Sequence, residues 1–147
     1  MITAWAPPCA KAPPTSPAAS AADAALRDAV AKKISAEYPS LEAIYKDLHA
    51  NPELSFMETR TAALVAKELR SLGFEVTEKV GNTGVVAVLK NGPGKTVLIR
   101  EDMDALPLLE KTSVPYASKA IVKDLAGKDS PAMHACAHDS HVTTLLG

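Results

Sequence analysis

The apolar residues of this chain change their spacing at Gly73, and that change limits the secondary structures that it can form. Before Gly73 they recur about every three to four residues, the period of a helix with one buried face. After it, residues 74–80 alternate apolar and polar side chains, and 85–89 is a continuous apolar run, patterns that are typical of strands. We therefore expect helices followed by a mixed sheet, in an α/β domain or its α+β variant.

In the N-terminal half, the spacing of the apolar residues predicts helices that are separated by prolines. A first helix covers 21–37, and Pro39 interrupts it because proline has no amide hydrogen to donate. Ser40 can cap a second helix, which carries apolar residues at helical spacing until Asn51-Pro52 ends it.

A third helix is predicted to begin at Ser55, where Glu58 completes a capping-box pattern. Gly73 ends this helix, because glycine readily takes the left-handed conformation that follows a last helical turn. The apolar face of the helix consists of Ala62, Val65, Ala66 and Leu69.

Further along, we expect a third strand at 96–100 and then mostly loop over 107–130. The strands 85–89 and 96–100 are expected to be buried on both faces, because their apolar residues are continuous. Residues 139–140 offer a cap for a final helix at 142–146.

Residues 1–20 are rich in proline, alanine and serine, and we expect them to form a disordered tail before a domain at 21–147. They lack the basic start and apolar core of a signal peptide. The compartment stays open: the cytoplasm is the default, and export is the alternative if the tail is the remnant of a signal.

Charge and composition narrow the range of partners. A net charge of -1 gives no electrostatic reason to bind nucleic acid or an anionic membrane. Aromatic residues make up only 4% of the chain, which leaves few rings for stacking on bases. No apolar run approaches the roughly 20 residues of a membrane span. We therefore expect neither nucleic acid nor a membrane as a partner.

Metal-ligating side chains gather near the end of the chain, where three of the four histidines and one of the two cysteines lie close together. They are His134, Cys136, His138 and His141. Thiolate and imidazole groups suit a transition metal. One residue separates Cys136 from His138, so both side chains point to the same side of an extended loop and can reach one ion. We therefore place this motif on a loop just before the final helix.

Two other interpretations compete with this loop site. The first is a buried structural cysteine beside unrelated histidines. The second is a helical site, because His134, His138 and His141 lie four and three residues apart. The helical site lacks the glutamate of a His-Glu-x-x-His motif, and a catalytic zinc usually takes about three protein ligands.

Acidic residues follow the third expected strand, at Asp102 and Asp104. Ligands of α/β sheets bind beyond the carboxyl ends of strands, so these carboxylates can bind a metal or orient a ligand imidazole. Solvation of the strand end accounts for them equally well. His49, Pro52 and Glu53 lie between two expected helices, and a polar turn that stops a helix is the simpler interpretation there.

Taken together, six segments of the chain resemble the amidohydrolase branch of the M20 metallopeptidase superfamily. That branch includes hippurate hydrolases, N-acyl-amino-acid hydrolases and indole-acetyl-amino-acid hydrolases. The segments are, in order, Leu48–Ser55, Leu72–Val76, Thr83–Ala87, Arg100–Pro107, Pro115–Ser118 and His134–Asp139. They occur in the order of the family, from about residue 38 to the end of the chain, which makes the resemblance specific.

The resemblance implies that this chain is the N-terminal part of a zinc-peptidase-like α/β catalytic domain, in a two-domain enzyme. Cys136 and His138 match two metal ligands, and Asp104 matches an acidic catalytic position beside the metal. The cofactor would be a divalent transition metal (Mn, Zn or Co), with two ions in the complete enzyme. A homodimer is expected only for the full-length enzyme, because the inserted second domain is the part that often dimerises.

The implied reaction is hydrolysis of the amide bond of an N-acyl-amino acid, a small-molecule substrate. The general-base glutamate and the other ligands lie further downstream in the family, so we expect this chain to be inactive alone. Ala137 stands where the family usually has glycine, and Glu101 stands where it usually has alanine. If the loop needs a positive φ at Ala137, the methyl group strains it.

Two rivals remain. One is a stand-alone metal-binding or interaction domain, in which Cys136, His138 and His141 close a structural site. The other is an inert fragment.

Overall fold

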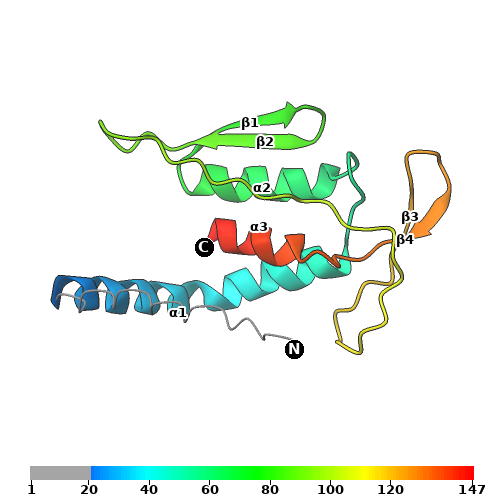
Figure 1. Cartoon of the computed structure of the whole chain (residues 1–147), viewed down its shortest axis with the longest axis horizontal. Helices are drawn as coiled ribbons and strands as arrows, with labels where there is room; N and C mark the ends of the chain where they lie inside the picture. Colours follow the sequence, from blue (N-terminus) through cyan, green and yellow to red (C-terminus); the bar gives the residue numbers. More distant parts are fainter. Residues whose placement is uncertain (1–20) are drawn as a thin grey trace, which may run out of the picture. The chain divides into compact units, whose positions relative to one another are not determined.

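The computed structural model describes residues 21–147, so the tail expected at 1–20 lies outside the described residues. The elements are α1 (Ala21–Ala50), α2 (Thr59–Ser71), β1 (Glu75–Val80), β2 (Gly84–Val88), β3 (Ile121–Lys123), β4 (Asp129–Pro131) and α3 (His138–Leu146) (Figure 1). The chain divides inside α1 into two compact units, one up to Lys33 and the other from Ile34 to Gly147. The core and the candidate site described below belong to the second unit.

Residues 21–50 form one helix, so the expected break at Pro39 is wrong. A proline removes only one amide donor from the helical ladder, and here the helix continues on both sides of Pro39. Ser40 does not cap a second helix. Its hydroxyl donates instead to the backbone carbonyl of Glu37, at 2.7 Å.

The helix α2 begins at Thr59, so the predicted start at Ser55 is also wrong. Glu58 occupies the N-cap position but makes no capping hydrogen bond. Its carboxylate accepts hydrogen bonds from the amide of Phe56, at 3.0 Å, and from the hydroxyl of Thr83, at 2.6 Å. The capping-box pattern misleads because these two partners compete for the same carboxylate.

The end of α2 follows the prediction. Gly73 has a φ of 87°, in the left-handed region. Its amide donates to the carbonyl of Arg70 at 3.0 Å, and the amide of Phe74 donates to that of Leu69 at 3.1 Å. This pair of bonds satisfies carbonyls that the last turn leaves free.

The core of this unit lies between α2, α3 and the end of α1. Its buried members are Leu48, Val65, Leu69 and Val142. In Figure 1, α2 lies between the hairpin β1–β2 and α3, and it contacts both. The apolar face predicted for α2 is buried here, as expected: Ala62, Val65, Ala66 and Leu69.

The first two predicted strands are present as the antiparallel pair β1 and β2. The expected strand at 96–100 does not form, and Val97, Leu98 and Ile99 are 81%, 88% and 65% exposed. A strand requires a neighbour for its amides and carbonyls, and within residues 21–147 β2 pairs only with β1. The burial of both faces expected for 85–89 is also wrong, because Val86 and Val88 are about half exposed.

Residues 107–130, expected to be loop, contain most of a second antiparallel hairpin, β3–β4. Each strand has three residues, which is too short for an alternation of apolar and polar residues to show. The Asp124 carboxylate closes the turn by accepting from the amides of Ala126 and Lys128, at 2.9 Å each.

Helices with small antiparallel sheets thus build an α/β fold. Within residues 21–147 both sheets are antiparallel, so the expected mixed sheet does not form there; one isolated parallel bridge joins Leu54 and Ala105 outside the strands.

Candidate metal centre

The loop that carries the Cys-x-His motif leads directly into α3, as predicted. His138 is the first residue of this helix, which begins before the expected start at Val142. Ala137 is the N-cap, with φ 62° and ψ 26° in the left-handed region. Residues 139–140 therefore lie in the first turn of α3, and the expected cap there is wrong.

His138 is oriented by Asp104, a residue far away in the sequence. The Nδ1–H group of His138 donates to the backbone carbonyl of Asp104 at 2.8 Å and lies 3.1 Å from its carboxylate. Within residues 21–147, both polar contacts of the ring are made through Nδ1. In the neutral ring this donation leaves the lone pair on Nε2, which is the usual arrangement of a metal-ligating imidazole with its other nitrogen held by an acceptor.

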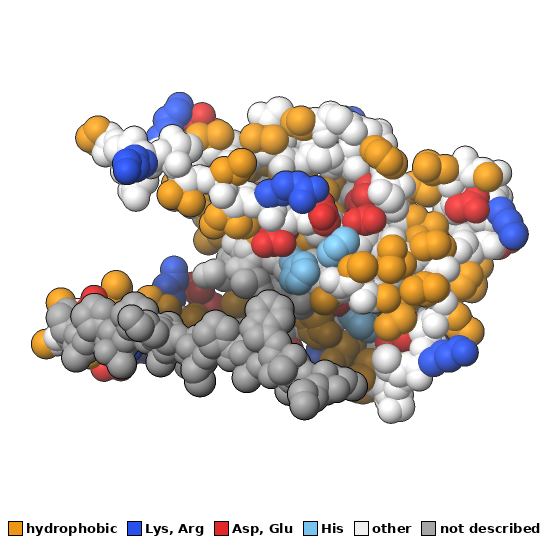
Figure 2. Space-filling model, in the orientation of Figure 1, with side chains coloured by type: hydrophobic (Ala, Val, Ile, Leu, Met, Phe, Trp, Pro, Cys, Tyr) orange, Lys and Arg blue, Asp and Glu red, His pale blue; other side chains and the backbone are white. Residues whose placement is uncertain are grey.

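The other donors of the cluster do not complete a site with His138. Cys136 is a free, exposed thiol. The His141 ring centroid lies 5.8 Å from that of His138, and its Nδ1 lies 3.9 Å from the Glu101 carboxylate. Figure 2 shows histidine side chains beside acidic ones on the viewed face. In the described part of the chain, no three His, Cys, Asp or Glu side chains are arranged to hold a metal ion.

The backbone that follows Asp104 is paired with two other segments of the chain. The amide of Ala105 donates to the carbonyl of Glu53 at 2.7 Å, and residues 105–106 bridge to Leu54 and Met133. This arrangement holds Asp104 in reach of His138. Asp102 is not part of it, because its carboxylate pairs with the exposed Arg100.

Glu53 also organises the start of α2. Its carboxylate accepts from the amides of Arg60 at 2.9 Å and Thr61 at 2.7 Å, and from the hydroxyl of Thr59 at 3.2 Å. A carboxylate there satisfies free amides and opposes the positive end of the helix dipole. Glu53 therefore links the start of α2 to the Asp104 loop, which the polar-turn interpretation missed.

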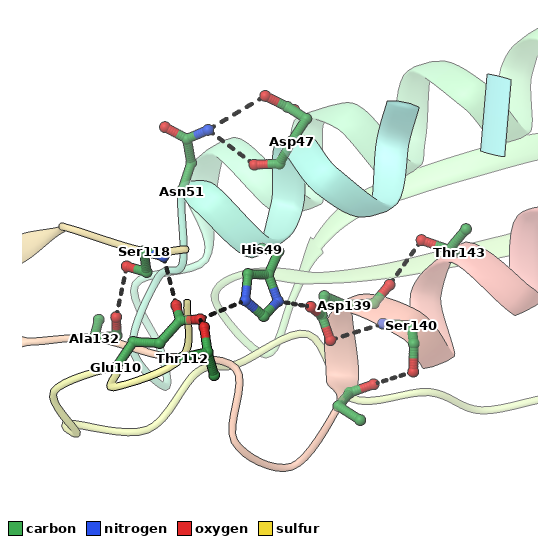
Figure 3. A network of polar contacts seen from close by, with 11 residues as sticks. Asp47, His49, Asn51, Glu110, Thr112, Ser118, Ala132, Asp139, Ser140 and Thr143 are labelled. Carbon is green, nitrogen blue, oxygen red and sulfur yellow. Dashed lines mark hydrogen bonds and ion pairs between the residues drawn. The ribbon is translucent and has the colours of Figure 1, made fainter. Parts of the chain in front are cut away.

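His49 is the main residue that the sequence analysis undervalued. Its ring is buried between two carboxylates: Nδ1 lies 2.6 Å from Asp139, and Nε2 lies 3.1 Å from Glu110 (Figure 3). Both contacts bridge segments far apart in the sequence. The only sequence signal was its place in the Leu48–Ser55 segment of the family resemblance.

The surroundings of His49 decide its charge. Burial alone lowers its pKa, but the hydrogen bonds to Glu110 and then Asp139 outweigh burial and raise the pKa above the usual histidine value. Burial raises the pKa of Glu110, but hydrogen bonds from Thr112, His49 and the Ser118 amide lower it overall. An imidazolium between two carboxylates is thus favoured.

His134 behaves differently. It is buried, and neither ring nitrogen has a hydrogen-bond partner within residues 21–147. Burial lowers its pKa, which keeps the ring neutral. A buried imidazole without partners loses the hydrogen bonds that water would give it.

Several known hydrolases are similar to this chain. Hippurate hydrolase of Campylobacter jejuni is 51% identical over 106 residues, which are 71% of this chain and 25% of that protein. An N-acyl-L-amino acid amidohydrolase of Geobacillus stearothermophilus is 42% identical over 103 residues, 69% of this chain and 25% of the relative. No family model matches the chain.

The fold has relatives of known structure. The YXEP protein of Bacillus subtilis, described as a dinuclear metal-binding peptidase of the M20 family, superposes with a TM-score of 0.64 at 34% identity. The match covers 76% of this chain and 29% of that one.

In fold and sequence this chain is similar to known hydrolases and peptidases. Within that class it belongs to the M20 family, in its amidohydrolase branch. The chain spans about a quarter of the length of the curated relatives that it matches.

The left-handed Ala137 yields a prediction about stability. Ala137→Gly should raise the free energy of unfolding in urea by roughly 1 kcal/mol, because a left-handed alanine is strained. The matched control is Ala135→Gly, at a residue without positive φ. That change should lower stability by roughly 0.5–1 kcal/mol, because glycine gains entropy on unfolding. Equal effects of the two changes would contradict strain at residue 137.

The charge of His49 predicts how stability depends on pH. Its raised pKa contributes stability that is full below the ordinary value of about 6.5 and is lost as the pH rises through the raised pKa. Glu110, with a lowered pKa, contributes above the ordinary value of about 4.3 and loses its effect as the pH falls through the lowered pKa. Burial also lowers the pKa of His134, so this residue reduces stability only as the pH falls below the ordinary histidine value.

Of these three groups, only His49 is therefore expected to change the stability as the pH rises above the ordinary histidine value. Urea unfolding between about pH 6 and 9 should show declining stability in the wild type. His49→Gln should show a flatter profile over that interval. A decline of the same size in both proteins would exclude His49 as its source.

Proposed function

We propose that the chain forms the N-terminal part of a catalytic domain that hydrolyses the amide bond of N-acyl-amino acids or related small amides. Cys136 and His138 would hold a divalent metal there, and Asp104 would orient the His138 ring. The observation that carries the proposal is the contact of His138 Nδ1 with Asp104, which leaves Nε2 for a metal, in a ring two residues after the free thiol of Cys136. The names of the relatives supply the substrate class.

The donor set suits the proposed metal. A thiolate and an imidazole bind Zn²⁺ and Co²⁺ well, and Mn²⁺ is the third candidate. When bound, such an ion polarises a carbonyl and activates a water molecule. The residues of this chain would hold the ion: Cys136 would bind it as a thiolate, His138 would offer Nε2, and the Asp104 carbonyl would accept a hydrogen bond from the Nδ1–H group of His138. Two ions in the complete enzyme would match the dinuclear relative.

The chain alone should not be active. Residues 21–147 hold no three-donor metal group, and a missing general base alone typically costs about 10²–10⁴-fold in rate. The same finding counts against a stand-alone structural site made by Cys136, His138 and His141. Dimerisation belongs to our proposal only for the full-length enzyme.

Metal binding tests the proposed half-site. We expect weak Co²⁺ binding with a thiolate-to-cobalt absorption band, strengthening as the pH rises and the thiol deprotonates. Cys136→Ser should remove the band, and His138→Gln should weaken binding. His141→Gln, which removes a nearby imidazole outside the proposed pair, should leave binding unchanged. Tight binding independent of pH, or a band that survives in Cys136→Ser, would contradict the assignment.

A chimaera tests the reaction. The 106 matched residues of the Campylobacter jejuni hippurate hydrolase can be replaced by those of this chain. We expect metal-dependent hydrolysis of hippurate by the chimaera, a loss of at least about 10²-fold in Cys136→Ser, and negligible turnover by the 147-residue chain alone. The unaltered relative is the control. A folded, metal-loaded chimaera without turnover would refute the proposed function.

A further inference from the structure

The buried histidine His49 joins three segments that the sequence keeps apart. His49 lies near the end of α1, Glu110 lies in the segment after Asp104, and Asp139 lies in the first turn of α3. Figure 3 shows the imidazole lying between the two carboxylates, with each ring nitrogen directed at one of them. Only 8% of the surface of His49 is exposed, so solvent cannot replace these partners freely.

Both carboxylates are anchored beyond their contact with His49. Glu110 accepts hydrogen bonds from the hydroxyl of Thr112 and from the amide of Ser118. Asp139 accepts one from the amide of Ser140 at 2.8 Å. The positions of both carboxylates are thus set by the backbone, and His49 connects two fixed points.

Aromatic rings close the remaining sides. The ring centroids of Tyr45 and Tyr116 lie 5.7 Å and 5.3 Å from that of His49. Burial and then the charge of Asp139 raise the pKa of Tyr45 to about 12, so its phenol stays neutral. The charged groups that contact His49 are therefore Glu110 and Asp139.

The place of the two carboxylates relates this cluster to the metal loop. Asp139 directly follows His138, the proposed ligand, and Glu110 belongs to the segment that leaves Asp104, the partner of the His138 ring. A buried ion cluster contributes little net stability because of its desolvation cost, but its geometry is well defined. The main effect of the cluster is therefore expected to be on the orientation of the segments that carry its two carboxylates.

We propose that His49 is a positioning residue for the metal centre. Through Asp139 it holds the first turn of α3 and the direction of His138, and through Glu110 it holds the segment that follows Asp104. This inference rests on the proposed function only in taking His138 as a metal ligand. The pairing of the His138 ring with Asp104, which needs no metal, is its second consequence.

The test uses the 147-residue chain with three isosteric or near-isosteric changes: His49→Gln, Glu110→Gln and Asp139→Asn. The control is Asp47→Asn, which removes a carboxylate from the same helix at an exposed ion pair with Arg60. Circular dichroism and urea unfolding give the folded fraction of each variant, and Co²⁺ titration gives the dissociation constant of that folded fraction.

The metal-free readout is the tautomer of His138, measured from its imidazole nitrogen shifts by NMR. The wild type and the control should hold Nδ1–H, and the three cluster variants should show mixed tautomers. For Co²⁺, the dissociation constant of the folded fraction should rise at least about tenfold in the cluster variants, the scale typical of lost outer-sphere partners. The control should bind as the wild type does.

The outcomes separate the two proposals. If the wild type binds no Co²⁺, the proposed function fails, and the His138 tautomer still decides the role of His49. Glu110→Gln, the variant furthest from α3, serves if the other two do not fold. Variants whose folded fraction keeps a single His138 tautomer and wild-type Co²⁺ affinity would overturn the positioning role and leave His49 as a core residue.

Discussion

The hydrogen bond from the His138 imidazole to the backbone carbonyl of Asp104 is the interaction on which the rest of the site depends. It joins the start of α3 to a loop that precedes the β3–β4 hairpin, and it leaves one ring nitrogen free for a ligand. The backbone pairing of Ala105 with Glu53 makes this bond possible, because it holds the Asp104 loop against the segment before α2. The orientation of a side chain thus depends on main-chain pairing elsewhere.

Two structural features fix the metal loop, and they have different physical origins. The left-handed Ala137 turns the chain sharply into α3, so that the motif lies on a loop and its histidine on a helix. The buried pair of carboxylates around His49 then holds the first turn of that helix. The position of His138 therefore depends on both the turn at Ala137 and the ion cluster around His49.

The apolar segment Val97–Ile99 shows the limit of local patterns. Its composition is that of a buried strand, yet its side chains face solvent. Whether an apolar segment becomes a strand depends on a neighbour that offers amides and carbonyls, and the segment has none within residues 21–147. The same dependence on partners left the short β3–β4 hairpin invisible in the sequence.

The sequence by itself determined the apolar face of α2, its glycine end, the first two strands and the Cys-x-His loop, because each rests on spacing or backbone freedom within a few residues. The family resemblance also singled out Asp104 as an acidic residue beside the expected metal. The tertiary structure alone decided that α1 continues through Pro39, that Glu58 bonds to Thr83 instead of capping α2, and that His49 lies between Glu110 and Asp139. These outcomes depend on which distant groups come within hydrogen-bonding reach, and spacing along the chain carries no information about that.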